Sequence, residues 1–118
     1  MKGCKEKIMP IFDGFASWGE ICHLFENYDI EPDQLYAALY DILHYDGCAN
    51  VLFKKNDLYY WAYGSHCSCY GLERQWDPEE YKTKELFIEA IKKYRFYDGP
   101  ESDDKNEAFI KQLIEMID

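Results

Sequence analysis

Positive charge is missing from a long part of this sequence. No lysine or arginine occurs between Ile8 and Phe53, although the 118 residues contain 13 of them against 23 aspartates and glutamates, giving a formal net charge of −10. A surface of this kind repels nucleic acid and attracts basic surfaces, including those with which other proteins hold DNA or RNA. The composition therefore argues against direct nucleic-acid binding, although acidity can also serve only to keep a small protein soluble.

Long apolar runs are also missing. No stretch reaches the roughly 18 apolar residues of a membrane-spanning helix, and the opening MKGCKEK does not lead into the apolar segment of a secretory signal. The five cysteines are an odd number with irregular spacing, which suits free thiols in a reducing compartment better than a disulfide framework. We therefore expect a cytoplasmic protein that does not associate with membranes.

The motifs of common catalytic sites are absent as well. The sequence contains no GxSxG, no HExxH and no glycine-rich phosphate loop. The acidic segment from Asp98 to Asp104 lacks the ligand order of a calcium-binding loop and is better explained as a turn before a helix. We therefore expect neither an enzyme nor a cofactor.

Apolar and aromatic residues are abundant enough for a folded core. They make up 47% and 18% of the chain, and 118 residues suit one domain, which we place at 1–118.

Local signals predict four helices. Ser17 and Glu20 form a capping box that predicts a short helix from Trp18. Pro32 predicts the start of a second helix that ends before Asp46. The apolar residues of this second helix recur at intervals of three and four: Leu35, Ala38, Leu39, Ile42, with Leu43 widening the face.

Two more helices are predicted in the second half of the chain. Thr83 caps a helix that ends at Asp98-Gly99-Pro100, and Ser102 starts the last one. The inward residues predicted for the first of these are Leu86, Phe87, Ala90, Ile91 and Tyr94, and those for the second are Phe109, Leu113, Met116 and Ile117.

Between these pairs of helices the pattern changes to that of strands. Residues 49–53 and 58–63 are short extended runs joined by the turn sequence KKND, and they predict a β-hairpin. Residues 64–76 predict a third strand or an ordered loop. The expected fold class is therefore α+β, a small antiparallel sheet (the hairpin plus a possible third strand) packed with about four helices.

The segment GSHCSCYGLERQW, residues 64–76, has three interpretations. His66, Cys67 and Cys69 could bind zinc, with Cys22, His23, His44 or Cys48 completing the site. Cys67 or Cys69 could instead serve a thiol enzyme, or the segment could belong to a small-ligand sponge. The third interpretation is architectural, with the cysteines as small buried residues and Trp76 at the edge of the core. The C-x-C spacing sets the sulfurs of an extended strand well apart, which argues against zinc and favours the architectural interpretation.

Aromatic residues cluster around the same segment. Tyr59, Trp61 and Tyr63 fall on one face of the second hairpin strand and Leu58, Tyr60 and Ala62 on the other. Such a set resembles a stacking platform for single-stranded nucleic acid, but a platform needs lysine and arginine beside it. Core packing and contact with a protein partner explain these residues better.

Two stretches of this chain resemble a known group of proteins. Residues 46–60, DGCANVLFKKNDLYY, and residues 64–80, GSHCSCYGLERQWDPEE, are similar to a family of small uncharacterised bacteriophage proteins in which a hairpin is followed by a GSHCSCYGLE-QW-PEE segment and a helix. The resemblance covers the middle third of the chain, and Arg74 and Asp77 depart from the usual pattern. It implies a phage origin and supplies no catalytic residues.

A phage origin and an acidic surface together suggest a function. Small acidic phage proteins often occupy the nucleic-acid-binding surface of a host protein. We therefore expect an acidic, anti-CRISPR-like inhibitor whose partner is a host protein with a basic surface. The residues expected to contact that partner are Asp29, Glu31, Asp33, Asp41, Tyr70 and Trp76.

Overall fold

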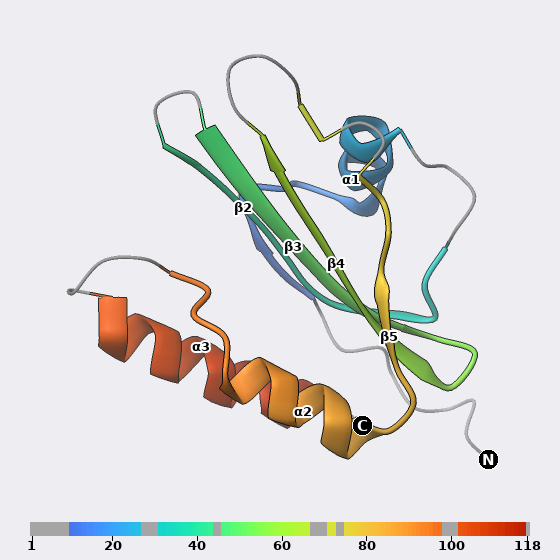
Figure 1. The fold of residues 1–118 in the computed structure, drawn as a ribbon, viewed down its shortest axis with the longest axis vertical. Helices are drawn as coiled ribbons and strands as arrows, with labels where there is room; N and C mark the ends of the chain where they lie inside the picture. Colours follow the sequence, from blue (N-terminus) through green and yellow to red (C-terminus); the bar gives the residue numbers. More distant parts are fainter. Residues whose placement is uncertain are drawn as a thin grey trace.

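The computed structural model describes residues 10–26, 31–43, 46–66, 71–72, 75–97 and 102–117, without the side chains of residues 42, 43 and 46. They form a five-stranded sheet in the order β1-β2-β3-β4-β5 and three helices. The elements are β1 (Ile11–Asp13), α1 (Trp18–Phe25), β2 (Gln34–Leu43), β3 (Asp46–Lys55), β4 (Leu58–His66), β5 (Glu79–Tyr81), α2 (Lys84–Lys92) and α3 (Asp103–Met116). β1 pairs with β2 in parallel, and the other neighbours are antiparallel. Helix α1 covers one face of the sheet, and α2 and α3 lie on the other (Figure 1).

The predicted architecture of a small sheet with about four helices is wrong. The segment expected to be the second helix is strand β2, an inner strand of the sheet between β1 and β3. Residues 35–39 of β2 are all buried, because helices cover both faces of the sheet. A strand buried on both faces is apolar almost continuously, and such a run also contains the three- and four-residue spacings of a helix. Strands β1 and β5 are only three residues long and gave no periodic signal.

A β-bulge at Tyr36 interrupts the alternation of β2. Leu35 pairs with Phe53 and Ala37 pairs with Leu52, so Tyr36 is the extra residue at which the register shifts. As a result, Tyr36 and Ala37 both pack on the face covered by α2 and α3, whereas Leu35 and Ala38 pack on the face covered by α1.

The predicted hairpin is confirmed and is longer than expected. Strands β3 and β4 pair from Gly47 with His66 to Lys55 with Leu58. The turn residues Asn56 and Asp57 have φ angles of 54° and 66°, the left-handed geometry that suits a two-residue hairpin turn.

Three of the four predicted helix starts are confirmed, those after Ser17, Thr83 and Ser102, and the start at Pro32 is wrong. Ser17 Oγ accepts a hydrogen bond from the Glu20 amide at 3.2 Å, and the Glu20 carboxylate accepts one from the Ala16 amide at 2.7 Å. Thr83 Oγ1 accepts from the Leu86 amide at 3.2 Å and caps α2. Helix α2 ends at Lys92, earlier than predicted, and Leu86 faces outward with 51% of its surface exposed.

Two hydrophobic cores fill the space between the sheet and its helices. The α1 face, which is the side of the sheet that α1 covers, packs Phe25, Phe53 and Trp76 together, with the rings of Phe53 and Trp76 stacked at 5.7 Å. The α2/α3 face is the opposite side, where Trp61 and Phe96 stack at 5.4 Å. The four residues of α3 and its end predicted to face inward are all buried here: Phe109, Leu113, Met116 and Ile117. No helix in the described ranges is long and apolar enough to cross a membrane.

Candidate functional site

The α2/α3 face changes from apolar to polar along the strands. One row of paired residues crosses four strands: Asp13, Leu39, Asn50 and Tyr63. The next row, towards the end of the sheet, is formed by Asp41, Cys48 and Ser65. Because side chains alternate along a strand, both rows lie on the same face as Leu52 and Trp61, which the helices cover. The helices leave these polar rows open.

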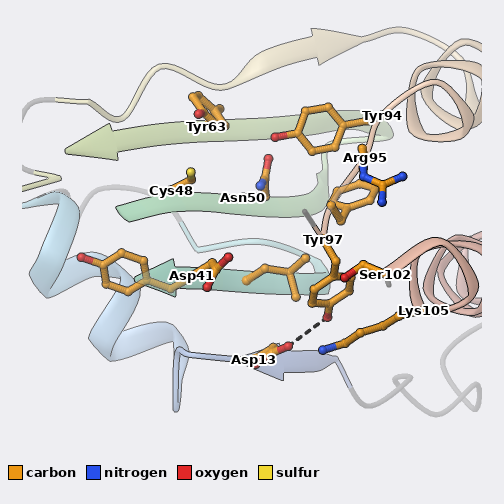
Figure 2. A pocket seen from close by; sticks show the side chains of 13 residues that line it. Asp13, Asp41, Cys48, Asn50, Tyr63, Tyr94, Arg95, Tyr97, Ser102 and Lys105 are labelled. Atoms are coloured by element: carbon orange, nitrogen blue, oxygen red, sulfur yellow. Dashed lines mark hydrogen bonds between the residues drawn. The ribbon is translucent and has the colours of Figure 1, made fainter. Parts of the chain in front are cut away.

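A cavity of about 500 Å³ lies over the polar rows, which we call the tyrosine cavity. One side is formed by the strands, and the other by the segment after α2 and the first turn of α3 (Figure 2). Its lining residues are Asp13, Leu39, Tyr40, Asp41, Cys48, Asn50, Tyr63, Tyr94, Arg95, Phe96, Tyr97, Ser102 and Lys105.

Asn106 fixes the wall of the cavity that comes from the helices. This residue of α3 is buried, and its Oδ1 accepts a hydrogen bond from the Tyr97 amide at 2.8 Å. Its Nδ2 donates to the Tyr97 carbonyl at 2.6 Å and to the Ser102 carbonyl at 2.9 Å. One amide side chain therefore holds the connection between α2 and α3 at its middle, Tyr97, and at its last residue, Ser102.

Tyr97 links this wall to the edge of the sheet. Its hydroxyl donates to Asp13 Oδ2 at 2.9 Å, a bond drawn in Figure 2, and Lys105 Nζ lies 4.1 Å from the centre of its ring. Burial raises the pKa of Tyr97, and the hydrogen bond to the Asp13 carboxylate raises it further. The hydroxyl stays protonated and donates to Asp13 throughout the physiological pH range.

Charges of both signs line the cavity. Arg95 forms an ion pair with Asp103 at 2.8 Å, which lies at the surface. Asp41 has no hydrogen-bond or ion-pair partner in the ranges that the structure describes. Burial raises the pKa of Tyr63, and its hydrogen bond to the Cys48 thiol adds to the effect. The arrangement offers carboxylate acceptors on the sheet side and cationic donors on the helix side.

The partner-contact residues predicted from sequence do not lie on one surface. Asp41 lines the tyrosine cavity, whereas Asp33 lies at the other end of β2, about 26 Å away at the rise of an extended strand. Asp33 Oδ2 accepts from the Asn56 amide at 2.8 Å, and the exposed Glu31 accepts a hydrogen bond from Lys55 Nζ through its backbone carbonyl. Asp29 and Tyr70 lie outside the described residues.

Trp76 packs in the aromatic core of the α1 face. Its ring contacts Trp18, Phe25 and Phe53 at centroid distances of 5.1 to 5.8 Å. Its indole Nε1 is buried and has no hydrogen-bond partner among the described residues. This position agrees with the architectural interpretation of the tryptophan at the edge of the core.

The residues suggested for zinc are only partly described. His66 lies on β4, and its Nε2 forms a 2.6 Å hydrogen bond with the Tyr40 hydroxyl. Cys48, suggested as a further ligand, lies on the α2/α3 face, whereas His66 packs with Tyr40 on the α1 face, so the sheet separates the two. Cys67, Cys69 and His44 lie outside the described residues. Within the described ranges, no three His, Cys, Asp or Glu side chains come close enough to hold a metal ion.

Gln75 fastens the end of the cysteine segment to strand β4. Its side-chain oxygen accepts from the Ser65 amide at 2.8 Å, and its Nε2 donates to the carbonyls of Ser65 and Gly71 at 2.6 and 2.7 Å. The Gln75 side chain therefore bonds to both the amide and the carbonyl of Ser65, as the backbone of a residue in a neighbouring strand would.

Sequence reasoning missed most of the tyrosine cavity. Asp13, Asn50, Tyr97 and Lys105 belong to four separate elements or loops, and only the strand register and the Asn106 contacts bring them together. One local signal was present, because Asn50 is a polar residue within the apolar run Ala49–Phe53. Comparison with protein-family models, curated proteins and solved structures found no match.

Proposed function

We propose that this chain is a phage-encoded, non-enzymatic protein that binds the basic surface of a bacterial host protein and inhibits it. The proposed partner is a nucleic-acid-binding protein of the host's defence system, such as a CRISPR effector. The chain would meet it in the host cytoplasm. The observation that carries the proposal is the segregation of charge between the two faces of the sheet.

The described segments that cover the α1 face carry carboxylates and no lysine or arginine, and Arg74, which precedes Gln75, lies outside the described residues. Glu20, Glu26 and Asp77 are exposed there, and residues 10–26 and 75–77 contain no lysine or arginine. The α2/α3 face is different, because its helices and their connection mix acidic residues with cations: Lys84, Lys92, Lys93, Arg95, Lys105 and Lys111. Exposed carboxylates that are not neutralised locally produce a negative potential, which guides a basic partner to one side of the molecule.

This proposal relocates the predicted contact surface. The sequence pointed to Glu31, Asp33 and Asp41, of which Asp41 lies on the opposite face. In the proposed mode, the exposed carboxylates of α1 and of the segment after Trp76 occupy the lysine- and arginine-rich groove of the host protein and exclude its nucleic acid.

The experiment is an affinity capture from bacterial lysate with two matched charge variants. Glu26→Lys/Asp77→Lys reverses two carboxylates on the α1 face, and Glu107→Lys/Glu115→Lys reverses two exposed carboxylates on α3. Both double variants lose the same amount of negative charge. We expect the wild type and the α3 variant to capture the same host protein and the α1-face variant to lose it.

Two further measurements complete this test. Capture should weaken as salt is raised, because exposed charges are screened over about 8–10 Å near physiological ionic strength. The captured protein, once purified, should lose its DNA or RNA binding when the wild-type chain is added. Equal loss of capture by both variants, or no capture at low salt, would contradict the proposal.

A further inference from the structure

The tyrosine cavity has the size and lining of a small-ligand site. Its volume of about 500 Å³ falls within the roughly 300–1,000 Å³ of typical ligand pockets. It is built from rigid parts, since strands form one side and the Asn106 hydrogen bonds fix the other. An apolar ligand does not suit it, because tyrosine hydroxyls, an asparagine, carboxylates and cations all reach the lining.

Asn50 places an unused hydrogen-bond donor in this cavity. The residue is only 5% exposed, and its Oδ1 accepts from Trp61 Nε1 at 2.9 Å. An indole nitrogen can only donate, so the amide atom facing it must be the oxygen, and this fixes the orientation of the amide group. Nδ2 then has no hydrogen-bond partner in the described part of the chain. The Nδ2 atom is open to the cavity that Asn50 lines, so it is available to donate to an acceptor on a ligand.

Aromatic rings stand beside this donor. Tyr63 on β4 and Tyr94 after α2 both line the cavity, as Figure 2 shows. Tyr94 is held by edge-on contacts with Trp61 at 5.0 Å and with Phe96 at 4.7 Å. Tyr63 remains 48% exposed, so its ring offers a free surface for a planar group. Aromatic side chains in such positions stack well on nucleobases.

Two cations lie on the helix side of the cavity. Arg95 and Lys105 come from the connection between α2 and α3 and from the first turns of α3. The sheet side supplies the acceptor Asp41 instead. A ligand that matches both walls of the cavity has a planar ring that carries hydrogen-bond donors and acceptors for the sheet side. It also has an anionic group that faces Lys105 on the helix side.

We infer that the tyrosine cavity binds a nucleoside monophosphate. Its base stacks on Tyr63, accepts a hydrogen bond from Asn50 Nδ2 and donates one to Asp41, while its phosphate contacts Lys105 and Arg95. This site is independent of the acidic surface on the α1 face and does not rest on the inhibitor function proposed above.

Isothermal titration calorimetry with the full chain tests this inference. The probes are AMP, GMP, CMP and UMP, each with its corresponding nucleoside. We expect at least one monophosphate to bind, and its nucleoside to bind more weakly because it lacks the phosphate. Absence of binding by all eight compounds at millimolar concentration would overturn the inference.

Lys105→Met and Lys111→Met separate a phosphate contact from a general charge effect. Both lysines are exposed on α3, but only Lys105 lines the tyrosine cavity. Lys105→Met should weaken monophosphate binding about tenfold, the loss expected for a charge-assisted hydrogen bond, and leave nucleoside binding unchanged. Lys111→Met should change neither. Equal losses in both variants would show that the phosphate does not bind at Lys105 and would overturn the inference.

Two further variants test the recognition of the base. Asn50→Asp keeps an acceptor for Trp61 and replaces the Nδ2 donor by an oxygen, so a folded variant should lose binding of nucleoside and monophosphate alike. Tyr63→Ala removes an exposed stacking ring and should weaken both by about fivefold or more. If Asn50→Asp does not fold, Tyr63→Ala still tests the recognition of the base. Wild-type affinity of Tyr63→Ala for both ligands would overturn the inference. Leu86→Ala, an exposed change on α2, is the control and should bind like the wild type.

Discussion

The two faces of the sheet differ in how completely they are closed. On the α1 face, one short helix and the segment around Trp76 fill the space with interlocking aromatic rings, and a Cβ atom added at Gly64 would lie 2.9 Å from the Phe25 ring. On the α2/α3 face, two helices cover the half of the strands nearest the β3–β4 turn, and the polar half stays open as the tyrosine cavity. One face is therefore closed by packing beneath an acidic exterior, and the other contains an open polar cavity. The predictions below test this contrast.

The largest expected effect is on the packing of the α1 face. Phe53 is 1% exposed and its ring contacts Trp18, Tyr60 and Trp76, so Phe53→Ala should lower the free energy of unfolding by about 3–5 kcal/mol. Tyr63→Ala in the open half should cost less than about 1 kcal/mol, because nearly half of that side chain is already exposed. Urea denaturation measures both. Similar losses would show that the two faces are equally packed.

A smaller loss is expected where the wall of the cavity is anchored. Asn106→Ala removes three part-buried hydrogen bonds to the backbone of Tyr97 and Ser102, which should cost about 2–3 kcal/mol. Gln112→Ala, an exposed change on the same helix, should have almost no effect. Hydrogen exchange of the Tyr97 amide should become faster in Asn106→Ala alone. Unchanged exchange would mean that other contacts hold this wall.

The smallest effect concerns the bond between Tyr97 and Asp13. Tyr97→Phe loses this hydrogen bond and should lower stability by about 1 kcal/mol near neutral pH. Because folding raises the pKa of Tyr97, the stability that this group contributes is complete below about pH 10, its unfolded pKa, and is lost as the pH rises towards the folded value.

The alkaline loss of stability should therefore be shallower in Tyr97→Phe than in the wild type. Some loss should remain in both proteins, because burial and the neighbouring Glu79 raise the pKa of Tyr81 to about 12. Urea midpoints at about pH 8 and about pH 11 provide the comparison. Equal slopes in the two proteins would show that Tyr97 does not titrate as described.

The elements that the sequence predicted well depend on short-range chemistry. Ser17 and Thr83 cap helices through bonds to residues three positions ahead, and the Asn56-Asp57 turn needs only two left-handed residues. Such signals are complete within a few residues and do not depend on the rest of the fold.

The parts that could not be predicted depend on what packs against them. QLYAALYDIL in β2 has few polar residues, and only the placement of helices on both faces makes it a buried strand instead of a helix. The tyrosine cavity follows from strand register, since Asp13 and Tyr63 lie at the two ends of one row of paired residues although 50 positions separate them in the chain. The sequence between Ile8 and Phe53 contains carboxylates and no lysine or arginine. The fold nevertheless places these carboxylates on both sides of the sheet instead of on one surface.

The bulge at Tyr36 decides which of those sides Asp41 reaches. If β2 alternated strictly from Leu35 through Tyr36, Asp41 would point into the aromatic packing beneath α1 and Tyr40 into the cavity. Changing Tyr36 from a bulged to a regularly paired residue would therefore exchange the two faces for the rest of the strand, whereas deleting it would leave every later residue on its present face. One bulged tyrosine thus sets the face on which a carboxylate five residues later lies.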